Sequence, residues 1–261
     1  MLRAARTTVQ RVRADAHRRA EVGRLAADAD ASGPTSQLRD ALATTRRIHR
    51  DPAARRWADR IETERARLAA SRDEIAGGRG TVATVGEVTR RASAPRHQGL
   101  VLHALARHLT ATAVLELGTC VGISGAYLAA ALDPARARLR SLEGHADRAR
   151  VAADTWDRLG LHHAEVTAGR FHRTLDDALA DGPYDLVHVD GDHDGEATLD
   201  HVRRIAAASR PGALLVLDDI DWSAGMRRAW QQLRTEFAGS ATSDLGRVGC
   251  LLLGEEDAGQ R

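Results

Sequence analysis

The sequence predicts an α/β fold: a doubly wound, mostly parallel sheet that ends in an antiparallel hairpin and carries a helical extension at its N-terminal side. After residue 80, short apolar runs alternate five times with amphipathic segments, which is typical of a parallel sheet with helices on both faces. Two strand-like runs then close the chain with no helix between them. The length of 261 residues suits one such domain with an appendage. We therefore expect a helical extension over residues 1–80 and a ligand-binding domain over residues 81–261.

The first 80 residues favour helices separated by breaks. Residues 1–35 are rich in Ala and Arg and end in Ala-Ser-Gly-Pro, which predicts a loosely held helix and then a break. From residue 36 to 75 the pattern is helical, and Pro52 is expected to split it into two helices. Three apolar residues spaced by seven form one stripe: Ile61, Leu68 and Ile75. We expect these helices to cap the rest of the chain or a partner subunit, with Gly77–Gly80 as a hinge.

The remaining chain predicts five parallel strands and a terminal hairpin. The strands are Ala113–Leu117, Arg138–Leu142, Ala164–Thr167, Tyr184–Val189 and Ala213–Leu217. The helices between and after them are residues 123–132, 146–160, 172–181, 195–208 and 224–238. The hairpin pairs Thr242–Arg247 with Cys250–Leu253. Because ligands of open α/β sheets bind at the carboxyl ends of the strands, functional residues are expected there.

Composition excludes several classes of protein. No apolar run approaches the roughly 20 residues of a membrane helix, and the first 30 residues lack the apolar stretch of a secretory signal. There are only two cysteines, Cys120 and Cys250, 130 positions apart and with no histidine pairing, which excludes a disulfide scaffold and a structural zinc site and favours a reducing cytoplasm. Every basic side chain except histidine is arginine, so no lysine can act as a base or nucleophile.

The net charge of +2 hides an asymmetry, since residues 1–110 are basic and residues 111–261 are acidic. A basic front half could attract nucleic acid, an acidic substrate or the acidic half of a neighbouring subunit. With only 3% aromatic residues, the chain lacks the interleaved aromatics of single-strand binders, so we do not expect nucleic acid as the partner. Self-association through the N-terminal helices is the further option that this asymmetry leaves open.

A glycine-rich turn follows the first predicted strand of the sheet, in the segment Glu116–Gly125. Its spacing is G-x-x-x-G-x-x-G, which differs from the dinucleotide fingerprint, and the lysine of a Walker loop is absent. Glu116, two residues before Gly118, can receive an ammonium group instead of cradling a phosphate. Glu143, at the end of the second strand, can accept both hydroxyls of a ribose, although a solvated strand-end acid is the alternative. This pattern describes a nucleoside that bears an amino acid, and S-adenosylmethionine fits it.

Acidic residues follow the fourth and fifth strands. Asp190–Glu196 resembles a calcium loop, but its twelfth position is His201 and a strand precedes it, so we reject that interpretation. If the two strands are neighbours, three carboxylates converge: Asp190, Asp218 and Asp219. Such a cluster repels itself unless a cation holds it, and hard oxygen ligands select magnesium, calcium or manganese. The alternative is one buried helix-capping aspartate with two solvated ones.

The segments ELGTCVGIS, DLVHVDGDH and GALLVLDDIDW, together with Glu143, resemble class I S-adenosylmethionine-dependent methyltransferases. They are most similar to the cation-dependent O-methyltransferases related to catechol, caffeoyl-CoA and macrolide-sugar methyltransferases, over residues 82–254. The resemblance implies a seven-stranded Rossmann-like fold, S-adenosylmethionine, a divalent cation such as Mg²⁺ and a hydroxylated small-molecule acceptor. The cofactor-binding residues it implies are Glu116, Gly118, Gly122, Ser124, Glu143, Arg170 and Asp190. The metal ligands it implies are Asp190, Asp218 and Asp219.

The general base departs from the catechol-type pattern. That pattern places a lysine three residues after the strand-four aspartate, where this chain has His193. Histidine is a suitable base at neutral pH, so we expect His193, or Asp190, to accept the substrate proton. Trp222 is expected either to wall the substrate or to fill a structural corner, and His188 to be a packed strand residue. Two rival functions remain: methylation of RNA or protein gripped by the basic N-terminal helices, and a non-catalytic scaffold of the same fold.

Overall fold

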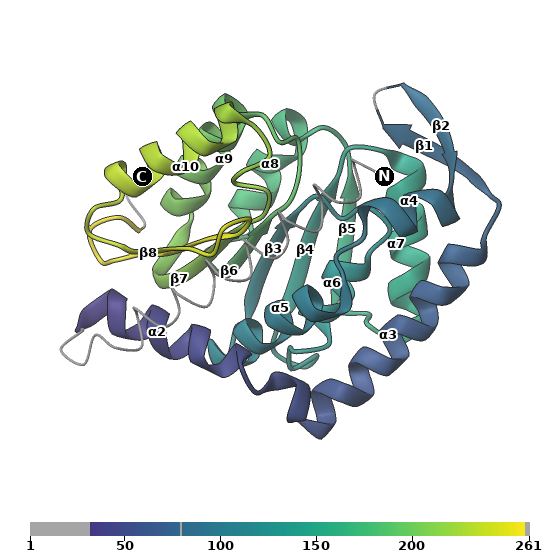
Figure 1. Cartoon of the computed structure of the whole chain (residues 1–261), viewed down its shortest axis with the longest axis horizontal. Helices are drawn as coiled ribbons and strands as arrows, with labels where there is room; N and C mark the ends of the chain where they lie inside the picture. The colour runs from purple at the N-terminus through teal and green to yellow at the C-terminus, as the bar shows by residue number, and fades with distance from the viewer. Residues whose placement is uncertain (1–31, 79, 259–261) are drawn as a thin grey trace, which may run out of the picture. The chain divides into compact units, whose positions relative to one another are not determined.

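The computed structural model describes residues 32–78 and 80–258, so the helix expected within residues 1–35 lies almost wholly outside the described residues. Nine strands and the helices that connect them follow one another along this part of the chain (Figure 1). The helices are α2 (Gly33–Thr45), the 3₁₀ turn η1 (Ile48–Arg50), α3 (Pro52–Ala70), α4 (Val85–Ala92), α5 (Arg96–His108), α6 (Ile123–Ala129), α7 (Ala146–Leu159), α8 (Phe171–Ala180), α9 (Gly195–Ala207) and α10 (Ala224–Glu236). The strands are β1 (Glu74–Gly78), β2 (Thr81–Thr84), β3 (Ala113–Leu117), β4 (Arg138–Glu143), β5 (Ala164–Ala168), β6 (Tyr184–Val189), β7 (Ser209–Leu217), β8 (Ala241–Asp244) and β9 (Gly249–Leu252).

Seven strands form the main sheet, in the order β5-β4-β3-β6-β7-β9-β8. The pairs β3–β4 and β4–β5 are parallel, whereas β9 is antiparallel to both β7 and β8. This confirms the predicted mostly parallel sheet with a C-terminal antiparallel hairpin. The five predicted parallel strands are all present, and β7 begins earlier than expected, at Ser209.

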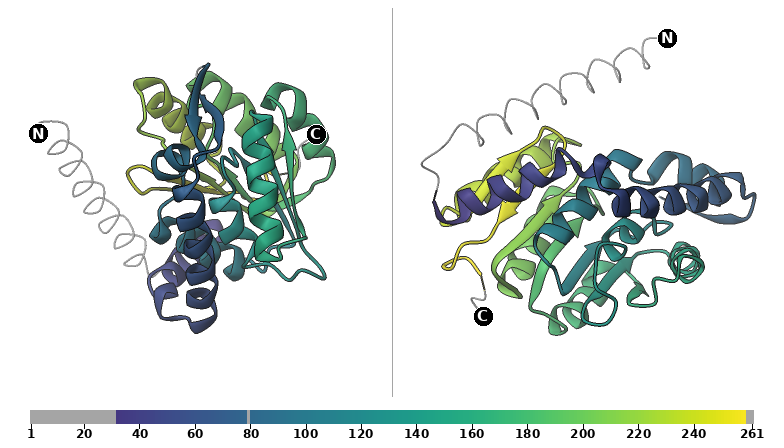
Figure 2. Two further views of the ribbon diagram at one scale, coloured as in Figure 1. Left: turned by 90° about the vertical axis from the view of Figure 1, so that its right-hand side faces the viewer. Right: turned by 90° about the horizontal axis from the view of Figure 1, so that it is seen from below.

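The chain divides into two compact units. One comprises Thr44–Leu186, and the other comprises the described residues up to Ala43 together with those from Val187 onward. In the first unit, α6, α7 and α8 contact β4, and α3 packs over α4, α5, α6 and α7 rather than on the strands (Figure 2). The helical segment is divided at Pro52, as the sequence predicted: Pro52 is the first residue of α3, and Asp51 caps that helix by accepting a hydrogen bond from the Ala54 amide at 2.8 Å.

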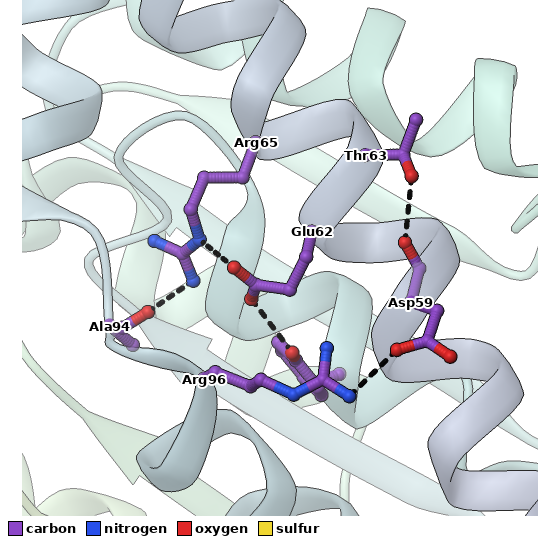
Figure 3. Close-up of polar contacts among 7 residues, drawn as sticks. Asp59, Glu62, Thr63, Arg65, Ala94 and Arg96 are labelled. Atoms are coloured by element: carbon purple, nitrogen blue, oxygen red, sulfur yellow. Dashed lines mark hydrogen bonds and ion pairs between the residues drawn. The ribbon is translucent and has the colours of Figure 1, made fainter.

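The apolar stripe of α3 is buried within its own unit. Ile61 and Leu68 are almost fully enclosed by the chain itself. Polar contacts from the same helix add to this packing: Glu62 accepts hydrogen bonds from Arg65 and from the hydroxyl of Tyr127 on α6, and Arg96 pairs with Asp59 (Figure 3).

The region between α3 and α4 differs from the prediction. The helix was expected to continue to Ile75, but it ends at Ala70, and Ile75 is buried from β1 instead. The predicted hinge is the turn between β1 and β2, where Gly78 and Gly80 adopt φ values of +94° and +76° that favour glycine. The Ala76 amide donates to Asp147 of α7, and Arg148 donates to the Ala76 carbonyl, which anchors the hairpin.

The second unit contains the acidic loops. Helices α9 and α10 begin immediately after these loops and approach closely at two glycines, because a Cβ on Gly195 would lie 2.6 Å from the carbonyl oxygen of Gly225. Both cysteines are free thiols, as expected. Among the helices of residues 32–78 and 80–258, none is long and apolar enough to cross a membrane.

Candidate functional site

The glycine turn lies between β3 and α6. Gly118, Cys120 and Gly122 all have positive φ, so the backbone makes a tight turn that residues with larger side chains adopt at a cost. Gly122 is also the N-cap residue of α6 and fits against α7, because a Cβ there would lie 2.9 Å from the Cα of Ala152. Ser124 is buried in the first turn of α6. The predicted residues Gly118, Gly122 and Ser124 therefore share one turn at the carboxyl end of β3.

Glu116 is enclosed beneath this turn and has no exposed surface. Its Oε2 accepts a hydrogen bond from the Ser141 hydroxyl at 2.7 Å, and the hydroxyls of Ser141 and Thr119 are 2.5 Å apart. Gly125 makes room for it, since a Cβ there would lie 2.8 Å from the same carboxylate oxygen. The sequence analysis did not identify Ser141 or Thr119. The β3–β4 register, which pairs Glu116 with Ser141, is the signal that could have found Ser141.

Glu143 ends β4 beside the same turn. One carboxylate oxygen accepts from the Cys120 amide at 2.8 Å and the other from the His145 amide at 2.9 Å. Burial raises the pKa of Glu143, although these amides oppose the shift. The carboxylate is thus fixed in direction by two backbone donors. Arg170, at the N-cap of α8, lies close by, with its Cδ 3.8 Å from where a Cβ of Gly144 would be.

The two acidic loops of the second unit are held by the helices that follow them. Asp194 caps α9 by accepting from the Ala197 amide at 2.9 Å, and Ser223 caps α10 by accepting from the Met226 amide at 3.1 Å. Three loop residues have a positive φ, a left-handed backbone conformation that is sterically unfavourable for residues other than glycine: Asp192, His193 and Asp219. Such strained residues persist where the surrounding structure fixes them, and they concentrate at functional sites.

The structure brings the predicted acidic residues into two groups that share Asp190. Ligand atoms of His188, Asp190 and Asp218 all lie within 4.8 Å of one another, as do those of Asp190, His193 and Asp219. We call these five residues the acidic cluster. His188 is fully buried, in agreement with a packed strand residue, but it also offers a ligand atom that the sequence analysis did not include.

The carboxylates of the acidic cluster perturb one another. Burial and the charge of Asp218 raise the pKa of Asp190 to about 8. The same two causes, burial first, raise the pKa of Asp219. Crowded carboxylates of this kind ionise together only when positive charge is supplied.

Arg247 supplies positive charge from the C-terminal hairpin. Its Nε lies 3.0 Å from Oδ1 of Asp218 and 2.8 Å from Oδ1 of Asp219. The sequence analysis missed this residue. The predicted C-terminal hairpin contained the signal that could have found Arg247. In the structure β9 runs antiparallel to β7 and pairs Gly249 with Leu217, so the residues before Gly249 lie beside those after Leu217.

His193 and Trp222 lie at the edge of the acidic cluster. The His193 Nε2 is 3.7 Å from Oδ2 of Asp219, and its ring centroid is 5.2 Å from that of Trp222. Trp222 is 60% exposed, so it is not the filler of a structural corner. An exposed aromatic ring beside an imidazole and a group of carboxylates can support a flat ligand whose hydroxyl meets a base.

Comparison with known proteins adds independent information. A methyltransferase-domain family model matches residues 115–220, which contain the glycine turn, Glu143 and all three aspartates. A catechol O-methyltransferase of Niastella koreensis is 33% identical over 127 residues, covering 48% of this chain and 56% of that protein. A catechol O-methyltransferase of Mycobacterium tuberculosis is 34% identical over 131 residues, covering 50% and 58% respectively. The chain thus spans little more than half the length of these curated relatives.

Solved structures share the fold. The O-methyltransferase TomG of Streptomyces achromogenes, involved in tomaymycin synthesis and solved with S-adenosylmethionine, matches with 27% identity and a TM-score of 0.53, covering 62% of this chain and 82% of that one. An O-methyltransferase of Bacillus cereus matches with 20% identity and a TM-score of 0.59, covering 74% and 90%.

Proposed function

We propose that the chain is an S-adenosylmethionine-dependent methyltransferase related to the catechol and caffeoyl-CoA O-methyltransferases, and that it methylates a hydroxyl group of a small molecule. The observation that carries the proposal is the acidic cluster, in which carboxylates from the ends of β6 and β7 meet His193. A site that binds only S-adenosylmethionine has no use for such a costly arrangement of like charges. A site that must hold and deprotonate a hydroxyl group does need such an arrangement.

The cofactor is assigned to the unit Thr44–Leu186. The fixed carboxylate of Glu143 suits two ribose hydroxyls, because its oxygens are already oriented by the Cys120 and His145 amides. The turn from Gly118 to Gly122 allows the backbone to approach a ligand closely. Glu116 is fully enclosed and hydrogen-bonded to Ser141, so it would not contact the methionine ammonium directly. It would instead hold in place the glycine turn that contacts the methionine part. Bound S-adenosylmethionine would supply an electrophilic methyl carbon.

A divalent cation is assigned to the acidic cluster. The donor chemistry fits: carboxylate oxygens of Asp190, Asp218 and Asp219 suit Mg²⁺ or Mn²⁺, and the imidazole nitrogen of His188 suits Mn²⁺ better. Bound there, the cation would supply the Lewis acidity that lowers the pKa of a substrate hydroxyl. The protein contributes three oriented carboxylates and a strained loop that holds them in place.

His193 is assigned as the proton acceptor. It is partly exposed, lies beside Asp219, and faces Trp222, so a hydroxylated ring stacked on the tryptophan would present its oxygen to the imidazole. The imidazole would accept the hydroxyl proton as the substrate oxygen takes the methyl group that S-adenosylmethionine supplies, with S-adenosylhomocysteine as the leaving group. We expect His193→Gln to lower the turnover rate by about 10²-fold, with partial recovery at high pH, where the hydroxyl ionises without help. An unchanged rate would remove His193 from the reaction.

A polymer substrate is disfavoured by the ion pairs of the basic half. The arginines of α3 and its neighbours that the structure pairs with acids have lost much of their attraction for phosphates. These pairs are Arg65–Glu62, Arg67–Glu64, Arg96–Asp59 and Arg107–Asp51. Retention on RNA with a steep salt dependence would instead favour the polymer.

The proposed function is tested by following a labelled methyl group. Purified chain and methyl-tritiated S-adenosylmethionine are incubated with catechols, diol-containing sugars and other hydroxylated natural products, with Mg²⁺, with Mn²⁺ or with EDTA. We expect transfer to at least one acceptor and its loss in EDTA. Transfer that continues in EDTA would remove the cation from the scheme. Failure to bind S-adenosylmethionine in calorimetry would contradict the proposal and favour a non-catalytic scaffold.

A further inference from the structure

Arg247 occupies an unusual position for a surface residue of a hairpin turn. Its backbone is fixed against the acidic loop, because the Ile220 amide donates to the Arg247 carbonyl at 3.0 Å. The turn itself is held by Arg227, which donates to Asp244 at 2.8 Å and to the Gly246 carbonyl at 3.2 Å. The backbone and Cβ of Arg247 therefore stay next to the acidic cluster even when the guanidinium changes its position.

The guanidinium bonds the carboxylates that the cation is assigned to use. Nε donates to Asp218 Oδ1, and a second nitrogen lies 3.4 Å from Asp218 Oδ2. Nε also lies 2.8 Å from Oδ1 of Asp219. A divalent ion binds carboxylate oxygens at about 2.0–2.6 Å, which would place two positive charges a few ångströms from the guanidinium. The two cations repel each other and compete for the same oxygen lone pairs.

The Arg247 guanidinium can also move away from the acidic cluster. The Arg247 side chain is 55% exposed, whereas the side chains of Asp218 and Asp219 are 2% and 9% exposed. Its long flexible stem can rotate into solvent, where the charge is fully hydrated, while the carboxylates stay in place. The arrangement is therefore reversible: an internal cation lies in the site and can be displaced.

We infer that Arg247 is a built-in counter-ion of the acidic cluster, which a divalent cation must displace in order to bind. This inference rests on the part of the proposed function that assigns a cation to the cluster. It has two consequences: the cation-free protein keeps its acidic loops folded, and the affinity for the cation is lower than the carboxylates alone would give.

The test measures binding of MnCl₂ to the whole chain, without S-adenosylmethionine or acceptor, from the EPR signal of free Mn²⁺. We expect Arg247→Gln to bind Mn²⁺ at least 10-fold more tightly than the wild type and to melt at a lower temperature in EDTA. The matched control is Arg203→Gln, which removes an arginine from another close pair in the same unit, with Glu236 at 2.6 Å. The control should leave Mn²⁺ affinity unchanged.

Equal or weaker Mn²⁺ binding by Arg247→Gln would overturn the inference. If that variant does not fold, Arg247→Lys replaces it: lysine keeps the charge but cannot bridge two carboxylates with a planar fork, so intermediate tightening is expected and none would be contradictory. Labelled methyl transfer, assayed separately, distinguishes the two ideas. Transfer without tighter Mn²⁺ binding overturns only the inference, whereas tighter binding without transfer to any acceptor overturns only the proposed function.

Discussion

The chain places carboxylates at the carboxyl ends of strands in two very different ways. In the unit Thr44–Leu186, Glu116 is held by the hydroxyl of Ser141 and Glu143 by two backbone amides. In the other unit, aspartates face each other and a guanidinium. Neutral donors orient a carboxylate and leave it ready for hydroxyl or ammonium groups, whereas crowded carboxylates call for a cation. This difference supports the proposal that the two groups of acids, although alike in sequence context, bind different partners.

The largest effect is expected from the crowded group. Asp218→Ala removes a 2% exposed carboxylate that belongs to the cluster, so cation-dependent turnover should fall at least about 10²-fold. S-adenosylmethionine affinity, measured by calorimetry, should change less than about twofold, because the cofactor is assigned to other residues. The exposed neighbour Asp221 gives the control, as Asp221→Ala should keep its turnover. Loss of cofactor binding in Asp218→Ala would show that the two groups do not act separately.

The reciprocal change should affect the cofactor alone. Glu143→Gln replaces one carboxylate oxygen by an NH₂ group, which then faces the N–H of Cys120 or of His145, now bonded at 2.8 and 2.9 Å. The substitution also removes the charge that makes the carboxylate a strong acceptor for the ribose hydroxyls. We expect S-adenosylmethionine to bind about 10-fold more weakly, while Mn²⁺ affinity stays the same. Glu165→Gln, on the exposed side of β5, serves as the control. Unchanged cofactor affinity would remove Glu143 from the proposed ribose contact.

The crowded group should also make stability depend on pH. The unfolded chain releases the Asp190 proton near pH 3.8, whereas the folded, cation-free chain holds it to about pH 8. The unfolded state therefore binds fewer protons between these values, so stability falls as pH rises through this window and is lowest above it. In EDTA and above pH 8, Asp190→Asn should have a melting temperature several degrees higher than that of the wild type. Near pH 4 the two melting temperatures should be equal. For a chain of this size, roughly 2–4 °C corresponds to about 1 kcal/mol.

Thermal melting across this pH range, with Asp221→Asn as the control, checks the prediction. A gain that is the same at every pH would mean that the substitution acts through packing. The charge of Asp190 would then not be the cause.

The smallest effect concerns the helical segment that supports the cofactor turn. The Tyr127 hydroxyl on α6 donates to Glu62 of α3 at 2.9 Å, and the tyrosine is fully buried. Tyr127→Phe keeps the ring and loses this bond, so the free energy of unfolding should fall by about 1 kcal/mol. Urea denaturation measures it. Thr63→Ala, which removes an exposed hydroxyl bonded within α3, should have almost no effect, and an equal loss in both variants would contradict the anchoring role.

Elements with a strong periodic pattern were predictable from the sequence, and contacts between distant segments were less so. The buried strand β6 was predicted with the bounds that the structure shows, because an apolar run followed by acidic and glycine residues has few alternatives. The β1–β2 hairpin was taken for a helix and a hinge, since Ile75 continues the spacing of Ile61 and Leu68 by coincidence. Local periodicity cannot reveal that Asp147 and Arg148, over 70 residues away, hold this strand.

The same limit applied to the candidate site. The convergence of Asp190, Asp218 and Asp219 was expected on the condition that the two strands are neighbours, and the sheet order places β6 beside β7. The contribution of Arg247 depended on the register of β9 against β7, and a slip of one residue would have turned its side chain away. Register is set by packing across the sheet, which the sequence pattern alone does not specify.

A crystal structure of the chain soaked with MnCl₂ and S-adenosylhomocysteine, with anomalous diffraction at the manganese edge, would locate the cation and the Arg247 side chain together. We expect a manganese peak about 2.0–2.6 Å from oxygens of Asp190, Asp218 and Asp219, with the Arg247 guanidinium turned into solvent and the ribose on Glu143. A guanidinium still bonded to both aspartates, with no manganese between the carboxylates, would contradict this expectation.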